Sequence, residues 1–467
     1  MTPSDIRLHN TLSRSKEPLP TGPDGTVRMY VCGPTVYGPI HVGNARPFVL
    51  FSLLKRFLQH SGYRVVLASN LTDVNDKIYA AAAREGVPSA ELAERYGREY
   101  VADTDRLGLG RPDVEPRVTD AIPEIVDMIA RLVDRGLAYA AGGDVYFRVR
   151  EFPGYGALSG RRLEEMLDTD PGPAKEHHLD FALWKGRKDG EDTFWDSPWG
   201  PGRPGWHIEC SAMAHAALGT DFEIHGGGID LVFPHHENEI AQSEGADGCR
   251  MAKLWVHNEM LELGGKMSKS DGNIVLLRDA LAEWPAEVLV MFFLRSHYRS
   301  KLPYGHDALA ESARAAERIR NTVRGLDRAL AAPGDQLRPA LARSVAEARA
   351  KFAEALADDF NTPGALAALF EAVAAVNAAV DGADRPSEGQ LQSVRTELAT
   401  MLDLLGLGAL AAPPGDDVPA DVAALVEARA AARAARDFAE SDRLRDAIRD
   451  LGYEVRDTPD GQQVGPR

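Results

Sequence analysis

Apolar residues near the N-terminus are grouped in a pattern that predicts a strand, a helix and a second strand. Residues 26–32 (TVRMYVC) form an apolar run of strand length, and residues 45–60 carry apolar side chains at helical spacing. After Ser61 and Gly62, residues 63–70 (YRVVLASN) form a second run of strand length. A strand–helix–strand unit implies a parallel sheet with a right-handed crossover. Ligands on such sheets bind at the carboxyl ends of the strands, so we expect a site where these two strands end.

The rest of the chain is predicted to contain an insertion, a helical bundle and a small tail. Residues 113–135 have a helical pattern, and residues 138–202 are rich in Gly, Pro and Asp with short strand-like runs. From residue 306 to about 407, apolar residues recur at helical spacing among Ala, Arg and Glu, which predicts a bundle of helices. Residues 411–417 (AAPPGDD) are typical of a linker. One or two helices and a hairpin are expected in residues 421–464.

The predicted fold class is therefore α/β. We expect a Rossmann-like parallel-sheet domain over residues 1–305, with an insertion at about 115–202. An α-helical bundle over residues 306–410 and a small C-terminal domain over residues 418–467 are expected to follow. The length of 467 residues is compatible with two to four domains.

Composition narrows the class of protein. Hydrophobic residues make up 44% and charged residues 26% of the chain, which is an ordinary balance for a soluble globular protein. The N-terminus lacks the apolar segment of a secretory signal, and no uninterrupted apolar run is long enough to span a bilayer. The cysteines, Cys32, Cys210 and Cys249, are too few and odd in number for a disulfide framework, so a reducing cytoplasm is expected.

The charge of the chain restricts how it can bind nucleic acid. The formal net charge is −17, so an RNA partner would have to be bound by a local basic surface and not by the overall field. One predicted helix has arginines spaced three to four residues apart over most of its length. The pattern alone favours a solvated amphipathic helix over an RNA-binding face. These arginines are Arg314, Arg318, Arg320, Arg324 and Arg328.

Two short segments far apart in the sequence carry the chemistry of a nucleotide phosphate site. The first, from His41 to Asn44 (HVGN), opens the helix predicted after the first strand. The second, KMSKS, places Lys266 and Lys269 three residues apart on a Gly-flanked loop. Phosphoryl and adenylyl transfer depend on cationic and N–H groups aimed at charge that develops on phosphate oxygens. KMSKS alone is compatible with a solvated surface loop, but its pairing with the upstream segment favours a phosphate site.

Another set of side chains has the chemistry of a metal site. Cys32 ends the first strand, Cys210 lies in the segment GWHIECSAM, and His235 and Glu239 stand four residues apart at a predicted helix start. Residues at this spacing project from one face of a helix, whereas His236 is expected to point elsewhere. Two thiolates, an imidazole and a carboxylate make a sensible zinc set. Spacing alone leaves open that Cys32 and Cys210 are buried apolar thiols.

Five segments of the chain resemble successive blocks of one enzyme family. These segments are CGPTVYGPIHVGNARPF, NLTDVNDKI, GPGRPGWHIECSAMA, HGGGIDLVFPHHENEIAQSE and GGKMSKSDGN. Together they resemble cysteinyl-tRNA synthetase, a class I aminoacyl-tRNA synthetase. The opening IRLHNTLSRSKEP and the closing ARDFAESDRLRDAIRDLGYEVRDTP are also similar to this family, so the resemblance covers nearly the whole chain.

The resemblance implies a cytoplasmic, monomeric ligase that takes ATP, L-cysteine and tRNA(Cys) as substrates and binds no membrane. Mg²⁺ would accompany ATP, and one Zn²⁺ per chain would be held by the two cysteines, the histidine and the glutamate of the candidate metal set. The helical region, residues 306–410, would bind the anticodon stem and anticodon. The C-terminal domain, residues 418–467, would also contact tRNA.

The same resemblance assigns catalytic roles to His41, Lys266 and Lys269 in the formation of cysteinyl-adenylate. All three are expected to contact ATP, and Lys269 most directly. The HIGH signature of the family corresponds here to HVGN, so Asn44 stands where the signature has its second histidine. The departure weakens a specific role for Asn44 in ATP binding, although its amide keeps a hydrogen-bond donor.

Further candidates for substrate contacts lie in the loops after the strands. Gly227 and Gly228 let the backbone approach adenosine closely, although a simple turn explains this run as well. Thr72 could hydrogen-bond the backbone of the cysteine substrate, or it could be an ordinary loop hydroxyl. Trp206 could form one side of the substrate pocket, or it could be a core aromatic residue. Asp230 could bind the substrate ammonium group or a ribose hydroxyl, or it could be a helix N-cap.

Such an enzyme must bind cysteine in strong preference to serine, which has nearly the same shape. Shape alone distinguishes near-isosteric side chains by roughly a hundredfold, which is too little for translation. A bound zinc ion deprotonates a thiol and bonds the thiolate, whereas a serine hydroxyl is a poor ligand. We therefore expect zinc to be the recognition element, and the sequence contains no large insertion typical of a separate editing domain.

Three other interpretations share part of these motifs. An enzyme that joins activated cysteine to an amino-sugar would have the same zinc and ATP segments, but it would not need the long helical region. A catalytically silent relative that binds RNA or senses zinc is disfavoured by the intact lysines and metal ligands. A nucleotidylyltransferase of the same superfamily is disfavoured by the full-length resemblance.

Overall fold

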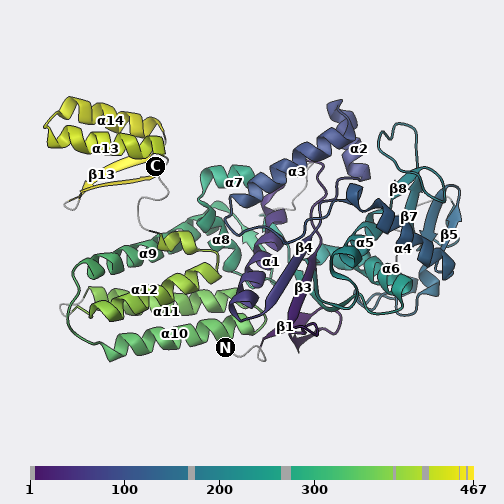
Figure 1. Ribbon diagram of the computed structural model, residues 1–467, viewed down its shortest axis with the longest axis horizontal. Coiled ribbons are helices and arrows are strands. Elements are labelled where there is room, and N and C mark those ends of the chain that lie inside the picture. The colour runs from purple at the N-terminus through teal and green to yellow at the C-terminus, as the bar shows by residue number, and fades with distance from the viewer. Residues whose placement is uncertain are drawn as a thin grey trace. The chain divides into compact units, whose positions relative to one another are not determined.

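The computed structural model describes residues 6–166, 174–263, 275–381, 385–412, 420–451, 453–458 and 461–466. The chain forms two compact units, Met1–Leu410 and Ala411–Arg467. The first contains a parallel sheet with its covering helices, an antiparallel insertion and a helical bundle; the second contains two helices and a hairpin (Figure 1). The predicted fold class is confirmed.

A four-stranded parallel sheet forms the centre of the first unit. Its strands lie in the order β10 (Ala252–Asn258), β9 (Phe222–Gly228), β3 (Thr26–Val31) and β4 (Arg64–Ser69). Strands β3 and β4 are the two predicted from the apolar runs, and helix α1 (Val42–His60) connects them. All neighbouring strands run parallel, so their carboxyl ends meet at one edge.

Helix α1 begins at Val42, three residues earlier than predicted, because a capping box forms its first turn. The Asn44 side-chain oxygen accepts a hydrogen bond from the His41 backbone N–H at 3.1 Å. The helix lies directly against β9, where a Cβ added to Gly226 would come within 2.1 Å of the Phe51 ring. Gly226 is therefore required for the close approach of helix and sheet.

Three helices pack together beside the sheet. Helix α5 (Trp206–Leu218) contacts β3 and β4, and it also contacts α4 (Ile122–Asp134) and α6 (Glu237–Asp247). Their buried residues form one apolar cluster that includes Tyr30 and Cys32 of the β3 segment. The other helices of this part are α2 (Asp76–Glu85), α3 (Ser89–Asp105), α7 (Leu277–Glu283) and α8 (Ala286–Leu294).

A buried carboxylate joins three strands near their amino ends. Glu223 of β9 accepts hydrogen bonds from the Arg28 backbone N–H at 2.8 Å, from its guanidinium Nε at 2.9 Å and from Lys253 Nζ at 3.0 Å. Arg28 belongs to β3 and Lys253 to β10. Burial opposes the charged form of Glu223, but these donors outweigh it and hold the pKa of the carboxyl group below its ordinary value.

The helix predicted over residues 113–135 is wrong in its first part. Helix α4 accounts only for its second half. Before it the chain is extended, and Val114 forms a bridge alongside Ala68 of β4. Pro116 explains the difference, because a proline disfavours the helical conformation of the residue before it.

The insertion is a four-stranded antiparallel sheet. Its order is β5 (Ala138–Ala141), β6 (Asp144–Phe147), β7 (Phe181–Gly186) and β8 (Gly202–Pro204). The rings of Phe147 and Phe181 stack with their centroids 5.1 Å apart, and both residues belong to the apolar cluster that α5 shares. Strand β6 confirms the strand predicted at DVYFRV.

The predicted bundle consists of α9 (His306–Ala331), α10 (Pro339–Ala357), α11 (Thr362–Val380) and α12 (Glu388–Leu404). Among the described residues, α11 alone is long and apolar enough to cross a membrane, which the sequence analysis did not anticipate. It packs against all three other helices, and Leu369, Val373 and Val376 are fully buried. The apolar surface of α11 is therefore accounted for as the core of the bundle.

Asp359, between α10 and α11, connects the bundle to the sheet domain. Its buried carboxylate accepts hydrogen bonds from the His9 backbone N–H at 2.8 Å, the Tyr298 hydroxyl at 2.5 Å and Arg299 Nε at 2.8 Å. Asp359 and Phe360 have φ values of +62° and +46°, in a region that non-glycine residues rarely adopt. These contacts hold the strained backbone in place. The short strands nearby are β1 (Arg7–Asn10), β2 (Ser15–Pro18), β11 (Leu261–Leu263) and β12 (Leu302–Tyr304).

The second unit contains the two helices and the hairpin expected at the C-terminus. These are α13 (Ala420–Ala434), α14 (Phe438–Asp450) and the antiparallel pair β13 (Tyr453–Thr458) and β14 (Gly461–Pro466). Val422, Ile448 and Val455 form its small core. Most of the expected linker lies outside the described residues.

We predict that Glu223→Gln lowers the free energy of unfolding by about 2 kcal/mol, because two partly exposed cations lose hydrogen bonds to a buried charged group. A carboxyl group with a depressed pKa contributes stability above its ordinary pKa, and that contribution is lost as pH falls through the folded-state value. The variant should therefore lose less stability than the wild type on acidification. Urea unfolding at several pH values measures both effects. Glu124→Gln, at an exposed position of α4, is the control, and equal losses in the two variants would contradict the prediction.

Candidate active site

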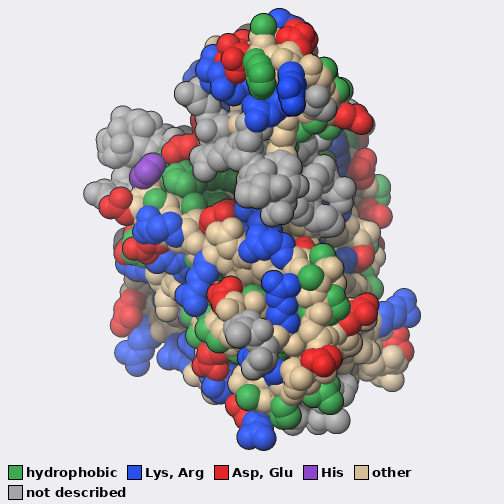
Figure 2. All heavy atoms as spheres, turned by 90° about the vertical axis from the view of Figure 1, so that its left-hand side faces the viewer, with side chains coloured by type: hydrophobic (Ala, Val, Ile, Leu, Met, Phe, Trp, Pro, Cys, Tyr) green, Lys and Arg blue, Asp and Glu red, His purple; other side chains and the backbone are tan. Residues whose placement is uncertain are grey.

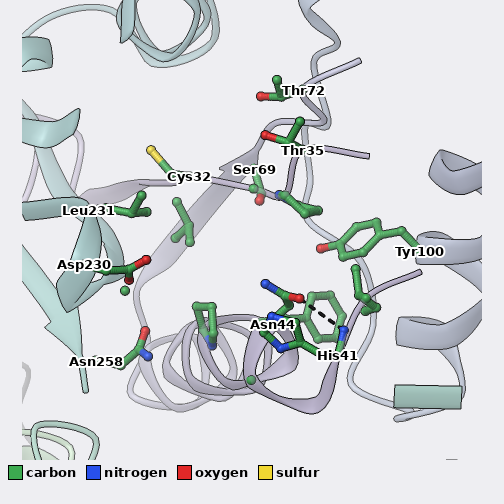
Figure 3. A pocket seen from close by; sticks show the side chains of 18 of the residues that line it. Cys32, Thr35, His41, Asn44, Ser69, Thr72, Tyr100, Asp230, Leu231 and Asn258 are labelled. Atoms are coloured by element: carbon green, nitrogen blue, oxygen red, sulfur yellow. Dashed lines mark hydrogen bonds between the residues drawn. The ribbon is translucent and has the colours of Figure 1, made fainter. Parts of the chain in front are cut away.

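A pocket of about 780 Å³ opens at the carboxyl ends of the four parallel strands (Figure 3). Its lining includes Cys32 directly after β3, Ser69 at the end of β4, Gly228 at the end of β9 and Asn258 at the end of β10. The N-terminus of α1 reaches the same pocket through His41. The pocket therefore lies where a parallel sheet places its ligand site.

Two thiols, an imidazole and a carboxylate meet beside this pocket. One ligand atom from each of Cys32, Cys210, His235 and Glu239 lies within 4.8 Å of the others, and all four side chains are buried. Glu239 Oε1 lies 3.3 Å from Cys32 Sγ and 3.1 Å from His235 Nε2. The structure thus brings together the four residues that the sequence grouped as metal ligands.

The electrostatics of this cluster suit a cation. Burial raises the pKa of the Cys32 thiol well above its ordinary value. Burial also lowers the pKa of His235 to about 3, which leaves the imidazole neutral and able to offer a lone pair. For Glu239, burial is outweighed by His225 and His235, which lower the pKa of the carboxyl group. Neutral imidazole, carboxylate and thiols that need a nearby positive charge to ionise match the donor set of Zn²⁺.

Neighbouring histidines orient the cluster. His207 Nδ1 lies 2.9 Å from His235 Nδ1, so Nε2 of His235 faces Glu239. His225 Nε2 lies 2.8 Å from Glu239 Oε2, which leaves Oε1 directed toward the cysteine and the imidazole. Contacts of this kind fix the tautomer and direction of metal ligands.

His236 does not point away from the cluster, as the sequence analysis expected. Its Nε2 lies 3.8 Å from Glu239 Oε1. Cys32, His225, His236 and Glu239 form a second group whose ligand atoms also lie within 4.8 Å of one another. The expectation was wrong because residues three apart on a helix also share a face, and His236 stands three residues before Glu239.

The HVGN segment forms the first turn of α1. The hydrogen bond from the His41 backbone N–H to the Asn44 side chain is the dashed line in Figure 3. Both residues line the pocket. Asn44 therefore has a structural task in addition to the ATP contact expected of it.

Lys266 and Lys269 lie outside the described residues.

Gly228 lines the pocket, whereas Gly227 does not. A Cβ added to Gly227 would come within 3.0 Å of His236 and Leu231. Glycine at position 227 is thus explained by close packing as well as by the expected approach to a nucleotide.

Trp206 and Asp230 both line the pocket. The Trp206 ring stacks on His235 with centroids 4.4 Å apart and an interplanar angle of 23°, and the residue is 38% exposed. It is a pocket wall and not a core aromatic residue. Asp230 lies within the 3₁₀ turn Ile229–Leu231 and not at a helix N-cap, and burial raises the pKa of its carboxyl group.

Thr72 also lines the pocket, but its hydroxyl is already engaged. It accepts a hydrogen bond from Asn70 Nδ2 at 3.0 Å and donates to Glu209 Oε2 at 3.5 Å. Glu209 is buried, and burial raises the pKa of its carboxyl group well above the ordinary value.

Several residues of the site were missed by sequence reasoning. The buried histidines His207, His225 and His257 stand in or near the segments quoted for the resemblance, yet their spacing has no metal-ligand pattern. His257 Nε2 lies 2.7 Å from His236 Nδ1, and Thr11 Oγ1 lies 2.8 Å from His257 Nδ1. The concentration of histidines in these segments was the only available signal.

The arginines of α9 divide into two groups. Arg320 and Arg324 form ion pairs with Glu317, and Arg320 also pairs with Glu287. Arg314, Arg318 and Arg328 line a groove of about 530 Å³ between α9 and α11. On the face of the molecule in Figure 2, Lys and Arg side chains are interspersed with Asp and Glu side chains. Positive charge therefore does not cover this face as a whole.

Comparison with known proteins identifies the family. Residues 19–314 match the family described as tRNA synthetases class I (C) catalytic domain, residues 351–410 match the DALR domain, and residues 415–464 match the cysteinyl-tRNA ligase anticodon binding domain. The cysteine–tRNA ligase of Symbiobacterium thermophilum is 46% identical over 98% of both chains. The chain belongs to the cysteine–tRNA ligases, which are class I aminoacyl-tRNA synthetases.

Other relatives agree with this assignment. The cysteine–tRNA ligase of Caldicellulosiruptor saccharolyticus is 43% identical over 98% of this chain and 99% of the relative. A solved structure of Mycobacterium tuberculosis methionyl-tRNA synthetase with methionyl-adenylate has a TM-score of 0.61 at 18% identity, covering 82% of this chain and 90% of that one. This structural likeness supports the class I fold.

We predict that Cys32→Ala removes one bound Zn²⁺ per chain, because the cluster loses one of its two sulfur ligands. Metal content after dialysis against limiting chelator, measured by elemental analysis, gives the result. Cys249→Ala is the matched control, since Cys249 is exposed and lies outside the cluster. Equal zinc content in both variants would contradict the assignment of Cys32 as a ligand.

Proposed function

We propose that the chain activates L-cysteine with ATP to cysteinyl-adenylate and transfers the cysteine to tRNA(Cys). One Zn²⁺ per chain is held by Cys32, Cys210, His235 and Glu239, and Mg²⁺ enters with ATP. The observation that carries the proposal is the buried thiol–imidazole–carboxylate cluster beside the pocket that also receives the N-terminus of α1. The family membership and the full-length match support the same reaction.

Amino-acid selection is the task of the metal cluster. When bound, Zn²⁺ supplies a centre that favours a substrate thiolate over a serine hydroxyl. Trp206, stacked on His235, closes one side of the space for a small side chain. Asp230 on the pocket rim is suited to the substrate ammonium group or a ribose hydroxyl, and Thr72 to the substrate backbone. Because the ligand chemistry separates cysteine from serine, a separate editing site is unnecessary.

Adenylate formation depends on groups aimed at the phosphates. The substrate carboxylate attacks the α-phosphate of ATP, and pyrophosphate leaves. His41 and the N-terminus of α1 are suited to donate hydrogen bonds to phosphate oxygens, since the helix end carries partial positive charge. Asn44 holds this first turn, and Lys266 and Lys269 supply cationic charge. Gly227 and Gly228 allow the nucleoside to approach the end of β9.

Transfer follows when the 2′-hydroxyl of the terminal ribose of tRNA attacks the mixed anhydride and AMP leaves. The adenylate phosphate is the base available to take the hydroxyl proton, as no external base is evident in the sequence. The groove between α9 and α11 is suited to the anticodon stem, and the C-terminal unit to the anticodon. We propose domain limits of 1–305, 306–410 and 418–467, a monomeric state and a cytoplasmic location for this reaction.

The decisive experiment has two stages. Cysteine-dependent ATP–pyrophosphate exchange tests the first step, and charging of tRNA(Cys) against an amino-sugar acceptor tests the second. We expect exchange, charging of tRNA(Cys) and no reaction with the amino-sugar, and we expect a chelator to abolish the first step. Exchange without tRNA charging would favour a ligase that uses a small acceptor, and absence of exchange would overturn the proposal.

We predict that Cys210→Ser weakens cysteine binding by at least tenfold more than ATP binding, because it replaces a thiolate ligand of the metal that recognises the substrate. Equilibrium binding of each substrate, followed by tryptophan fluorescence, measures the two affinities. Cys249→Ser controls for the loss of a thiol elsewhere. Equal losses for cysteine and ATP would contradict a role of the metal in amino-acid recognition.

We predict that the double variant Arg314→Ala/Arg328→Ala weakens tRNA(Cys) binding by about tenfold at 150 mM salt and lowers the salt dependence by about two phosphate contacts. Binding titrations at several salt concentrations test this, and ATP–pyrophosphate exchange should be unchanged. Arg343→Ala, at an exposed position of α10 outside the groove, is the control. An unchanged salt dependence in the double variant would contradict an RNA-binding role for the groove.

A further inference from the structure

One buried hydroxyl beside the metal cluster has no nitrogen or oxygen partner among the described residues. Tyr30 is fully buried, and its phenolic oxygen is sealed from solvent. An unsatisfied buried polar group costs about 1–3 kcal/mol. Phenylalanine would fill nearly the same volume without this cost, so the oxygen requires an explanation.

Strand β3 places Tyr30 beside the metal-ligand cluster. Tyr30 and Cys32 stand two residues apart in the β3 segment, so their side chains project from the same face of the sheet. Both belong to the apolar cluster that contains Cys210 of α5. Tyr30 also pairs in register with His225 of β9, and the two rings meet edge to face with centroids 5.4 Å apart.

The two thiols near the hydroxyl differ in what they can accept. Cys32 Sγ is directed at Glu239 Oε1, 3.3 Å away. Cys210 Sγ has a long contact, 3.7 Å, with Asn70 Oδ1, and it also lies within hydrogen-bonding reach of the Cys32 thiol and the Tyr30 hydroxyl. Cys210 is therefore the sulfur with room for a donor.

We propose that Tyr30 is a positioning residue whose hydroxyl donates a hydrogen bond to the Cys210 thiolate when the cluster holds its metal ion. The inference rests on the proposed zinc site. A neutral thiol is a weak acceptor, whereas a thiolate is a strong one, so the bond gains most of its strength when Cys210 ionises. It orients the sulfur and stabilises its charge within an otherwise apolar surrounding.

The variant Tyr30→Phe removes a single oxygen and separates this role from a packing role. Zinc affinity, measured by competition with a chromophoric chelator, should fall by about 10–100-fold, the usual effect of losing an outer partner of a metal ligand. The unfolding midpoint of the metal-free protein should stay the same or rise, because an unsatisfied polar group has gone. In the Co²⁺-substituted protein, the thiolate-to-metal charge-transfer band should shift.

Tyr139→Phe is the matched control, since the Tyr139 hydroxyl has a partner, Asp180 at 2.9 Å, outside the cluster. That variant should lower stability and leave zinc affinity and the cobalt band unchanged. If Tyr30→Phe instead destabilises the metal-free protein and retains wild-type zinc affinity, the hydroxyl is structural and the inference is wrong. A wild-type chain that binds no zinc would overturn the metal site itself, which is a different result.

Discussion

The contact on which the site depends is the meeting of two thiols, an imidazole and a carboxylate at one buried point. Cys32 follows β3, Cys210 lies in α5, and His235 and Glu239 flank the start of α6. These segments come together only when β3 and β9 pair and α5 packs against the sheet. The same sheet brings the N-terminus of α1 to the pocket, so one sheet places both the thiol–imidazole–carboxylate cluster and this helix end. Such a cluster links folding to metal binding, because its buried thiols ionise only beside a cation.

Positive charge is unevenly distributed over this acidic chain. The chain as a whole carries a formal charge of −17, which repels a polyanion such as RNA. Many surface cations are neutralised by neighbouring carboxylates, as Arg320 is by Glu287 and Glu317. The groove between α9 and α11 is lined by three arginines together with Glu317 and Asp381, so basic side chains outnumber acidic ones there. Binding of nucleic acid to such a protein depends on where unpaired charge lies, and overall charge opposes it.

The sequence predicted the parts of the fold that depend on local pattern. Apolar runs located β3, α1 and β4, and the ligand chemistry of Cys32, Cys210, His235 and Glu239 selected residues that the structure brings together. Predictions failed at two places for different reasons. Pro116 keeps an apparently helical stretch extended, and His236 reaches the cluster because it stands three residues before Glu239 on the same helix face.

Long-range packing limited the prediction of the candidate site in another way. Nothing in the spacing of His207, His225 and His257 indicates that they surround the metal ligands, because they reach the cluster from three different segments. The capping role of Asn44 follows from a side-chain orientation that a motif does not specify. The lysines of the KMSKS segment lie outside the described residues, so their positions stay a prediction.

The buried carboxylate of Asp359 has a mechanical consequence. It holds the turn between α10 and α11 to β1 and to Tyr298 and Arg299, which precede β12. Strand β12 pairs with β11, and β11 leads in sequence directly to the segment that contains the two lysines. The turn between the two helices is thus held by hydrogen bonds to residues next to the strand pair that borders that segment. A displacement of this turn cannot leave the strand pair unchanged unless those hydrogen bonds break.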